Sequence, residues 1–346
     1  MKELSEIAEK WSEREYRLRP ELSQSTLANY ERLGYNGLDH LFDTKETPSL
    51  TFGSCVDAII TGGIEEFNKR FEVFDLNITD GGLDTVRQLL AMDLSYPTFE
   101  EIPAIVVSNA AKAAGFWQAD KWDKKRYAEV LKTGDVGGYY NACKNSDKKI
   151  ISSEVYNDVV KCVQALKESY ISSRYFADND PFSPVQRYYQ LKFKGIHEGV
   201  GYRGMLDLVV VDHEKKVIYP CDLKTSSHYE WDFEDSFIQW QYQLQARLYW
   251  RLLRMNLDAD EYFKDFKLEN FRFIVVNKRT LTPLVWEFPY SEAIGTLVDS
   301  QGKEYRDPYE IGKELSGYLS LKPPVPNGIY LNKLNVINNL KPKESN

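Results

Sequence analysis

Residues 204–224, which read "GMLDLVVVDHEKKVIYPCDLK", predict two adjacent β-strands. The runs 206–211 and 217–221 are short, apolar and rich in β-branched side chains, a composition typical of strands. The residues between them, 212–216, are polar and turn-like. We therefore expect a β-hairpin, which requires a sheet in this half of the chain.

Charged side chains stand where the second strand of this hairpin ends. Side chains alternate between the two faces of a strand, so Asp222 and Lys224 share one face and Leu223 lies on the other. Pairing the strands across the turn brings Asp207 close to Asp222. The hairpin thus predicts two carboxylates and one ammonium group at one end of a sheet.

A purely structural interpretation explains the same residues. An acidic residue two positions before a lysine is common in this chain, so the tripeptide alone carries little information, and a salt bridge at a strand end would account for it. On the residues alone, the salt bridge and the functional site both stay open. The same spacing occurs at Asp43/Lys45, Asp123/Lys125, Asp147/Lys149, Glu214/Lys216 and Asp265/Lys267.

The hairpin is followed by a predicted helix over about 235–255, which contains "IQWQYQLQARLYW". Gln241, Gln245 and Tyr249 recur at intervals of four, and Tyr242 lies three residues before Gln245, so all four share one face of a helix. Such a stripe is usually a solvated face. Its position directly after the hairpin also suits a face turned toward a polar ligand.

The order of elements predicts an α/β (α+β) fold with a central mixed sheet flanked by helices and preceded by a mostly helical region. We expect domain limits at 1–175, 176–330 and a polar tail at 331–346. The expected elements are a helix through about 30–32 capped by Ser23 or Ser25, helices from near Gly53 and over 154–170, strands at 185–193, 202–211, 217–225, 271–276 and 284–288, and a largely helical stretch over 291–318.

Composition narrows the classes of protein and of metal site. No apolar run approaches the length that spans a bilayer, and the charged amphipathic N-terminus is no secretory signal, so we expect a cytoplasmic protein without membrane contact. The four cysteines lack CxxC spacing, and only four histidines occur, which argues against zinc or iron–sulfur sites and for free thiols. A metal ion here would be bound by oxygen, as Mg²⁺ or Mn²⁺ is.

The net charge of −8 argues against a protein that coats nucleic acid without specificity, because such proteins neutralise phosphates with a basic surface. It is compatible with an enzyme whose own carboxylates hold divalent cations.

Three pieces of sequence, in this order, resemble the PD-(D/E)xK nuclease superfamily in its RecB-like branch. They are the Gly-x-x-Asp of 204–207, the Asp-x-Lys of 222–224 and the Gln-x-x-x-Tyr of 245–249. More loosely, 22–60 and 271–288 resemble phage-type exonucleases of the RecE-like group, so the resemblance extends from about residue 20 to 330. It implies a restriction-endonuclease-like core.

The chain departs from the pattern of this family at two positions. Asp57, in "GSCVDA", stands where members commonly carry a histidine, and an aspartate also ligates divalent cations. Gln186, or as the less favoured choice Gln190, stands where many members carry a glutamate on the strand before Gly-x-x-Asp.

The resemblance implies hydrolysis of phosphodiester bonds with one or two Mg²⁺ or Mn²⁺ ions. Asp207 and Asp222 would hold the metal, with Asp57 and the Leu223 carbonyl as further ligands. Lys224 would orient the attacking water or neutralise developing charge. Gln245 and Tyr249 would fix the scissile strand. Further candidates for DNA contact are Gln186, Gln241, Tyr242, Ser23 and Ser25.

The same resemblance implies an exonuclease that processes double-stranded DNA ends for recombination or repair. A related endonuclease, or a DNA-binding protein that kept the fold and lost catalysis, are the alternatives. A single-strand annealing protein as partner and a homo-oligomeric state are expected by analogy with the family. The chain has no GxxxxGK[ST] motif and no C-terminal cysteine cluster, so helicase-linked and iron–sulfur nucleases are disfavoured.

Overall fold

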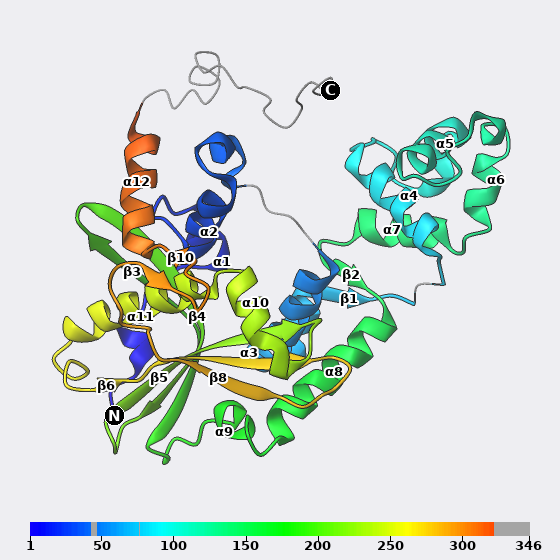
Figure 1. The fold of residues 1–346 in the computed structure, drawn as a ribbon. Coiled ribbons are helices and arrows are strands. Elements are labelled where there is room, and N and C mark those ends of the chain that lie inside the picture. Colours follow the sequence, from blue (N-terminus) through cyan, green and yellow to red (C-terminus); the bar gives the residue numbers. More distant parts are fainter. Residues whose placement is uncertain (43–46, 76, 322–346) are drawn as a thin grey trace, which may run out of the picture. The chain divides into compact units, whose positions relative to one another are not determined.

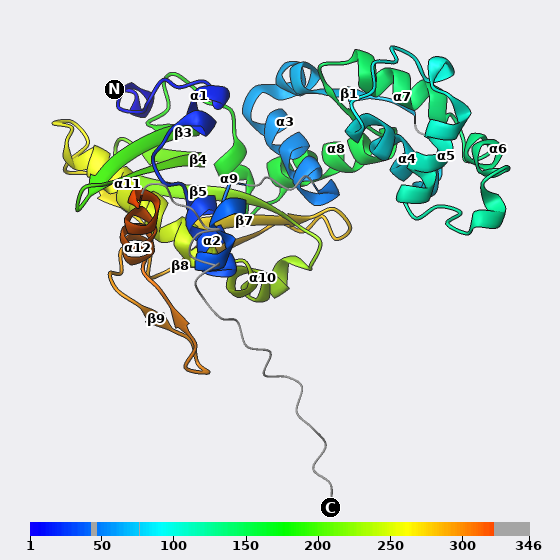
Figure 2. The same cartoon turned by 90° about the horizontal axis from the view of Figure 1, so that it is seen from above.

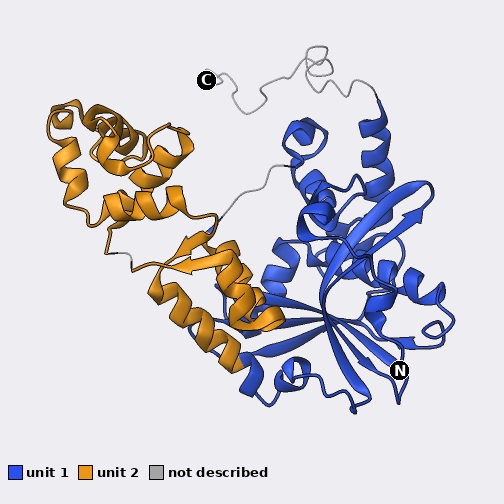
Figure 3. Cartoon of the chain, turned by 180° about the vertical axis from the view of Figure 1, so that it is seen from behind, with its two compact units in different colours: residues 1–47, 166–346 blue, residues 48–165 orange. Residues whose placement is uncertain are grey.

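A computed structural model describes residues 1–42, 47–75 and 77–321, and it divides into two compact units. Unit 1 comprises residues 1–47 and 166–346, and unit 2 comprises residues 48–165 (Figure 3). The sequence predicts one boundary near residue 175 instead. The difference arises because Leu4, Leu22 and Leu27, near the N-terminus, are buried in the core of unit 1. The predicted tail at 331–346 lies outside the described residues.

Unit 1 is built on a mixed sheet, which confirms the predicted α/β class (Figure 1). Its strand order is β3-β4-β5-β7-β8, with β6 paired to β5 beside this path. The β5–β7 and β5–β6 pairs are parallel and the other pairs are antiparallel. The strands are β3 (Val185–His197), β4 (Val200–Asp212), β5 (Val217–Ser226), β6 (Lys267–Leu268), β7 (Phe271–Asn277) and β8 (Leu284–Phe288).

The predicted hairpin is present as β4 and β5, with a polar turn between them. Asp212 Oδ1 accepts a hydrogen bond from Lys215 N at 2.9 Å, and Lys216 adopts a left-handed φ of 54°. The ladder runs from Asp212↔Val217 to Leu208↔Cys221, where its last backbone pair lies. The turn therefore fixes the register of every residue up to the strand end.

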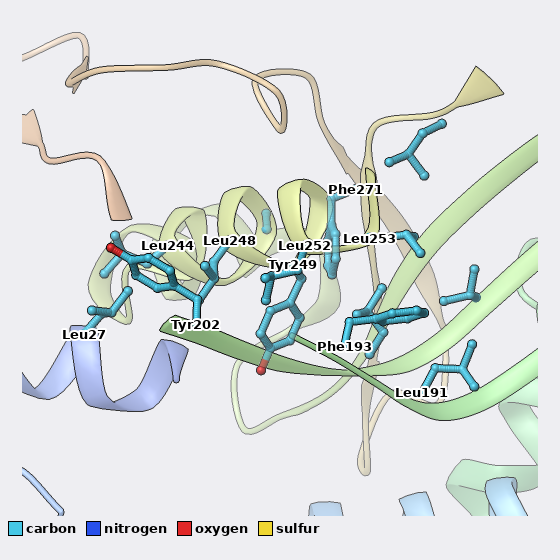
Figure 4. Packing of buried hydrophobic residues seen from close by; sticks show 14 of the residues in the cluster. Leu27, Leu191, Phe193, Tyr202, Leu244, Leu248, Tyr249, Leu252, Leu253 and Phe271 are labelled. Atoms are coloured by element: carbon cyan, nitrogen blue, oxygen red, sulfur yellow. The ribbon is translucent and has the colours of Figure 1, made fainter. Parts of the chain in front are cut away.

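Helix α11 (Tyr242–Asp258) covers one face of the sheet and carries much of the core. Figure 4 shows Leu248, Tyr249 and Leu252 projecting from α11 toward the sheet, where β3 carries Phe193 and Leu191. The other helical segments of unit 1 are η1 (Leu4–Glu6), α1 (Glu13–Leu18), α2 (Gln24–Leu33), η2 (Tyr35–His40), α9 (Ser173–Phe176), η5 (Glu230–Asp232), α10 (Phe233–Gln239) and α12 (Pro308–Ser320).

The single helix predicted over 235–255 is wrong, because the chain breaks it into α10 and α11. Gln241 has a left-handed φ of 52°, which ends one helix and starts the next. The break lets Phe233 and Phe237 of α10 pack against Phe273 of β7, at ring-centroid distances of 5.5 and 5.6 Å. Packing of these aromatic side chains outweighs the helical periodicity here.

The helical stretch predicted over 291–318 is also wrong in its first half. Residues 297–305 form a hairpin of β9 (Leu297–Val298) and β10 (Glu304–Tyr305), which projects away from the large sheet in Figure 2. Gly295 and Gly302 adopt φ values of 85° and 79°, and such left-handed positions exclude a continuous helix. Asp307 caps α12, which begins with Pro308.

Unit 2 is mostly helical, with one short parallel pair of strands. The predicted helix over 154–170 is confirmed, and the helix expected from near Gly53 begins at Pro48. A separate hydrophobic cluster, around Val86, Val107 and Tyr140, joins α4, α5 and α7. The elements are α3 (Pro48–Arg70), β1 (Phe71–Val73), α4 (Asp80–Ala91), η3 (Phe99–Glu101), α5 (Ala104–Ala113), η4 (Asp120–Trp122), α6 (Arg126–Leu131), α7 (Val136–Asn145), β2 (Lys149–Ile151) and α8 (Ser153–Glu168).

Among the described helices, none is both long and apolar enough to cross a membrane.

Candidate active site

Asp207 and Asp222 lie at the point where β4 and β5 separate. The register of the hairpin places them directly opposite each other, one position beyond its last backbone pair. Asp207 Oδ2 accepts a hydrogen bond from Leu223 N at 3.2 Å. A side-chain oxygen thus takes the place of the backbone carbonyl that would accept this bond in a continued pair of strands. The carboxylate of Asp207 is therefore held by the backbone of β5, directly beside Asp222.

Lys224 and Gln245 complete a closed network around Asp222. Lys224 Nζ lies 2.7 Å from Asp222 Oδ2 and donates a hydrogen bond to Gln245 Oε1 at 2.9 Å. Gln245 Nε2 donates to Asp222 Oδ1. The ring of Tyr242 lies 4.4 Å from Lys224 Nζ and supports the cation from another side. The salt bridge at the strand end and the candidate functional site are therefore the same group of residues, because the Lys224–Asp222 pair is part of the network.

The charge of Lys224 follows from this network. Burial alone would lower the pKa of Lys224, but the negative charge of Asp222, together with Asp207, outweighs it and raises the pKa to about 12. The side chain is therefore an ammonium ion at neutral pH. It can stabilise negative charge or orient a water molecule, but it cannot accept a proton.

Tyr249 packs flat against the backbone of β4 at Gly204. A Cβ atom at Gly204 would lie 2.8 Å from a ring carbon of Tyr249, so only glycine allows α11 to approach this closely. Burial raises the pKa of Tyr249 well above its usual range, and so do its neighbours Tyr16 and Asp222. The hydroxyl is therefore neutral and acts as a hydrogen-bonding group.

Sequence reasoning missed Tyr16 and Arg203, which lie beside Tyr249. Tyr16, on α1, makes a side-chain hydrogen bond with Tyr249, and the Arg203 guanidinium lies 5.2 Å from the centroid of the Tyr16 ring. Arg203 is buried, and its Nη1 donates to Arg19 O at 2.8 Å. No motif signals Tyr16, since nothing in its local sequence shows that α1 packs beside a helix more than 200 residues later.

The close approach at Gly204 predicts a specific cost. Gly204→Ala places a methyl group against the buried Tyr249 ring and Leu252, and we expect a loss of about 1–3 kcal/mol in the free energy of unfolding. Gly317→Ala is the matched control, because it lies on an exposed part of α12 with open space around it. This control should be stabilised by about 0.5–1 kcal/mol. Urea unfolding curves of both variants measure the difference, and equal midpoints would contradict the packing argument.

The structure separates the two glutamines that were candidates for the position of the family's glutamate. The ladder of β3 and β4 places Gln190 across from Asp207, and Gln190 has a left-handed φ of 53°. Gln186 is buried, and its Nε2 donates to the carbonyls of Asp180 and Ser183, both at 2.8 Å. By position, Gln190 is the residue beside the carboxylates, whereas Gln186 holds a turn.

Asp57 lies on α3, in unit 2. Its carboxylate is 3.8 Å from Arg70 Nη1, and its side chain is partly exposed. The units are described separately, so a role for Asp57 as a ligand in the site of unit 1 stays a prediction.

The remaining candidates for DNA contact have different surroundings. Ser23 is the predicted N-cap of α2, where it is buried and accepts from Thr26 N at 3.3 Å. Ser25 is exposed on the first turn of that helix. Gln241 forms the break before α11, so it does not belong to one helical face with Gln245. Tyr242 opens α11 beneath Lys224.

The donor set at the strand end fits a hard divalent cation. Two carboxylates face each other, and Asp222 Oδ2 is buried without a well-formed hydrogen bond among the described residues, so the charge of Lys224 is what offsets it. Oxygen donors of this kind are the ligands of Mg²⁺ and Mn²⁺. In the described ranges, no group of three or more His, Cys, Asp or Glu side chains is positioned to hold a metal ion, so a cation here would need other oxygen ligands as well.

Comparison with known proteins gives little further information. No family model matches the chain, and no curated protein matches it. The structure is similar to a solved chain described as a "Putative exonuclease" from Eubacterium rectale, with a TM-score of 0.41 and 12% sequence identity over 94% of this chain and 89% of that one. Any function must therefore be argued from the residues of this chain.

Proposed function

We propose that this chain is a metal-dependent nuclease that hydrolyses DNA phosphodiester bonds, acting as an exonuclease on double-stranded ends. One observation carries the proposal: Asp207 and Asp222 lie opposite each other where two strands separate, with Lys224 bound to both Asp222 and Gln245. A buried cluster of unlike charges at a strand end is a costly arrangement, and such clusters are common at functional sites.

Each residue of the cluster has a distinct role in this proposal. Asp207 and Asp222 would hold a Mg²⁺ or Mn²⁺ ion, with the Leu223 carbonyl as a further ligand. When bound, that ion supplies a Lewis acid that withdraws negative charge from the phosphate. Lys224, whose pKa the charge of Asp222 raises, would stabilise the charge that develops on the phosphoryl oxygens.

Gln245 positions the two groups on either side of it. Its amide donates through Nε2 to Asp222 and accepts through Oε1 from Lys224, so it fixes the orientation of both. Because each end of the amide is occupied by a different partner, Gln245 is a positioning residue. Tyr249 and Tyr242 support the same region from α11, Tyr249 with a buried neutral hydroxyl and Tyr242 with its ring beside Lys224.

Metal dependence is the first expected result. The protein is incubated with linear and with covalently closed circular duplex DNA, each with Mg²⁺, Mn²⁺ or EDTA. We expect loss of linear DNA with either metal, none with EDTA, and persistence of the circles. Gel electrophoresis over time measures all of these arms.

The other outcomes identify the alternatives. Metal-dependent nicking of circles would indicate an endonuclease. Retarded migration of DNA without cleavage in any metal would indicate a DNA-binding protein that has lost catalysis, and cleavage that persists in EDTA would contradict the metal site.

A further inference from the structure

Two exposed aromatic rings follow the candidate active site along the chain. Tyr229 and Trp231 are 49% and 54% exposed, and their rings stack at a centroid distance of 4.5 Å with 10° between the planes. Each ring covers one face of the other, and about half of each residue remains exposed to solvent. Aromatic side chains this exposed do not gain the stabilisation that burial of their apolar surface would give. A binding role would account for their position.

The residue between the rings anchors them rigidly. Glu230 is fully buried, and its Oε1 accepts hydrogen bonds from Asn277 N at 2.9 Å and Thr282 N at 3.1 Å. Its Oε2 accepts from Thr280 Oγ1 at 2.5 Å, and its carbonyl accepts from Trp286 Nε1 at 2.9 Å. The carboxylate of Glu230 thus binds this loop to the turn between β7 and β8. Because Glu230 points into the protein, its two aromatic neighbours remain at the surface.

The turn bound by Glu230 carries two basic residues. Lys278 and Arg279 follow Asn277 directly and are both exposed. Asn277 Nδ2 also donates to His228 O at 2.8 Å, which ties the turn to the residue before Tyr229. Basic groups beside flat aromatic faces are the combination that binds single-stranded nucleic acid, with phosphates on the cations and bases on the rings.

The rings also lie within reach of the carboxylates. Tyr229 follows Lys224 by five residues, a chain length that spans at most about 18 Å. Ser226, between them, is paired with Asn277 at the ends of β5 and β7. A DNA strand that occupies the active site can therefore continue onto the rings.

We propose that Tyr229 and Trp231 form a stacking platform for unpaired bases of the DNA strand that enters or leaves the active site. This inference rests on the proposed nuclease function and specifies its substrate as DNA with a single-stranded or frayed end. The exposed acidic residues Asp232, Glu234 and Asp235 follow Trp231, so the phosphates are expected on the side of Lys278 and Arg279.

Binding without cleavage tests the platform directly. A fluorescently labelled single-stranded oligonucleotide of about 12 nucleotides is titrated with protein in EDTA, and anisotropy gives the Kd. We expect Tyr229→Ala and Trp231→Ala each to weaken binding by roughly tenfold, since stacking of one base is worth about that factor or more. Tyr229→Phe and Trp231→Phe keep a flat ring and should bind within about twofold of the parent protein.

The matched control is Tyr170→Ala, which removes a tyrosine that is 97% exposed elsewhere in unit 1 and should leave the Kd unchanged. An unchanged Kd in the Tyr229→Ala/Trp231→Ala double variant would overturn the proposal and leave the rings as a surface for a protein partner. A thermal unfolding midpoint equal to that of the parent protein shows that each variant is folded.

The two proposals fail in different ways. Ring-dependent binding in EDTA without cleavage in any metal supports the platform and contradicts the nuclease. Metal-dependent cleavage with ring-independent binding supports the nuclease and contradicts the platform. Within an active enzyme, the double variant should raise KM for DNA with unpaired ends more than it lowers kcat.

Discussion

Replacing Asp222 with asparagine is expected to reduce metal-dependent cleavage of linear duplex DNA by at least about a thousandfold. The substitution removes one charge from the pair that would hold the cation, and a bound cation contributes several kcal/mol to the stabilisation of a phosphoryl-transfer transition state. The asparagine Oδ1 can still accept from Gln245 Nε2, so the local packing should persist. Initial rates of nucleotide release measure the effect.

The hairpin offers a matched control for this substitution. Asp212, at the turn end of β4, is also buried and pairs with Lys215 Nζ at 3.1 Å, so Asp212→Asn removes the same chemical group from a buried aspartate outside the cluster. It should retain cleavage. Full activity in Asp222→Asn, or equal losses in both variants, would contradict the assignment of the site. Retained DNA binding by Asp222→Asn would show that only the chemical step is lost.

Replacing Asp307 with alanine should destabilise unit 1 by about 3–5 kcal/mol, because it leaves two buried guanidinium groups without their counterion. Asp307 is buried and lies 2.6 Å from Arg247 Nη2 and 2.7 Å from Arg251 Nη2. It also accepts from Gly295 N at 2.9 Å and from Tyr309 N at 2.8 Å. This carboxylate therefore joins the β9–β10 hairpin, α11 and the start of α12.

A surface pair on α11, the helix that carries Arg247 and Arg251, is the control for Asp307→Ala. Arg254 Nη2 lies 2.6 Å from Asp258 Oδ1, but the Asp258 side chain is 61% exposed, so Asp258→Ala should cost less than about 1 kcal/mol. Urea unfolding followed by tryptophan fluorescence compares the two variants. Similar midpoints would show that the buried network contributes no more than an exposed pair.

The pH dependence of unfolding gives a second measurement on Asp307. Burial would raise the pKa of this carboxyl, but hydrogen bonds from Arg251 and from Tyr309 N, with the charges of both arginines, hold it below its usual range. A lowered pKa in the folded state means that the stabilisation is complete above about pH 4 and is lost only as the pH falls through the folded value. The difference in stability between the parent protein and Asp307→Ala should therefore shrink in acid.

The sheet and its site could be predicted from local sequence because the signals are short in range. The alternation that puts Asp222 and Lys224 on one face is a property of any strand, and the polar turn at 212–216 fixes the register that brings in Asp207. The presence of Gln245 beside these residues could be predicted because it lies on the helix that follows the hairpin. Five strands of the large sheet were recognised by their β-branched and aromatic content in the same way.

The remaining features depend on contacts between distant segments. The break at Gln241 is imposed by aromatic packing against β7, which the periodicity of α10 and α11 does not reveal. Tyr16 reaches Tyr249 only because α1 packs beside the core. Glu230 resembles any other surface glutamate in the sequence, and its burial becomes visible only with the turn it binds.

The placement of residues 1–47 in unit 1, ahead of the 48–165 segment that forms unit 2, has a consequence for biosynthesis. Tyr30 is hydrogen-bonded to Glu314, a partner 284 residues later, so this contact cannot form until residue 314 has left the ribosome. Unit 2, a continuous segment, can fold while unit 1 is still incomplete. The core that contains Leu22 and Leu27 also includes Ile311 and Leu315 of α12, so it is completed late, and apolar side chains of the first helices stay exposed in the nascent chain until then.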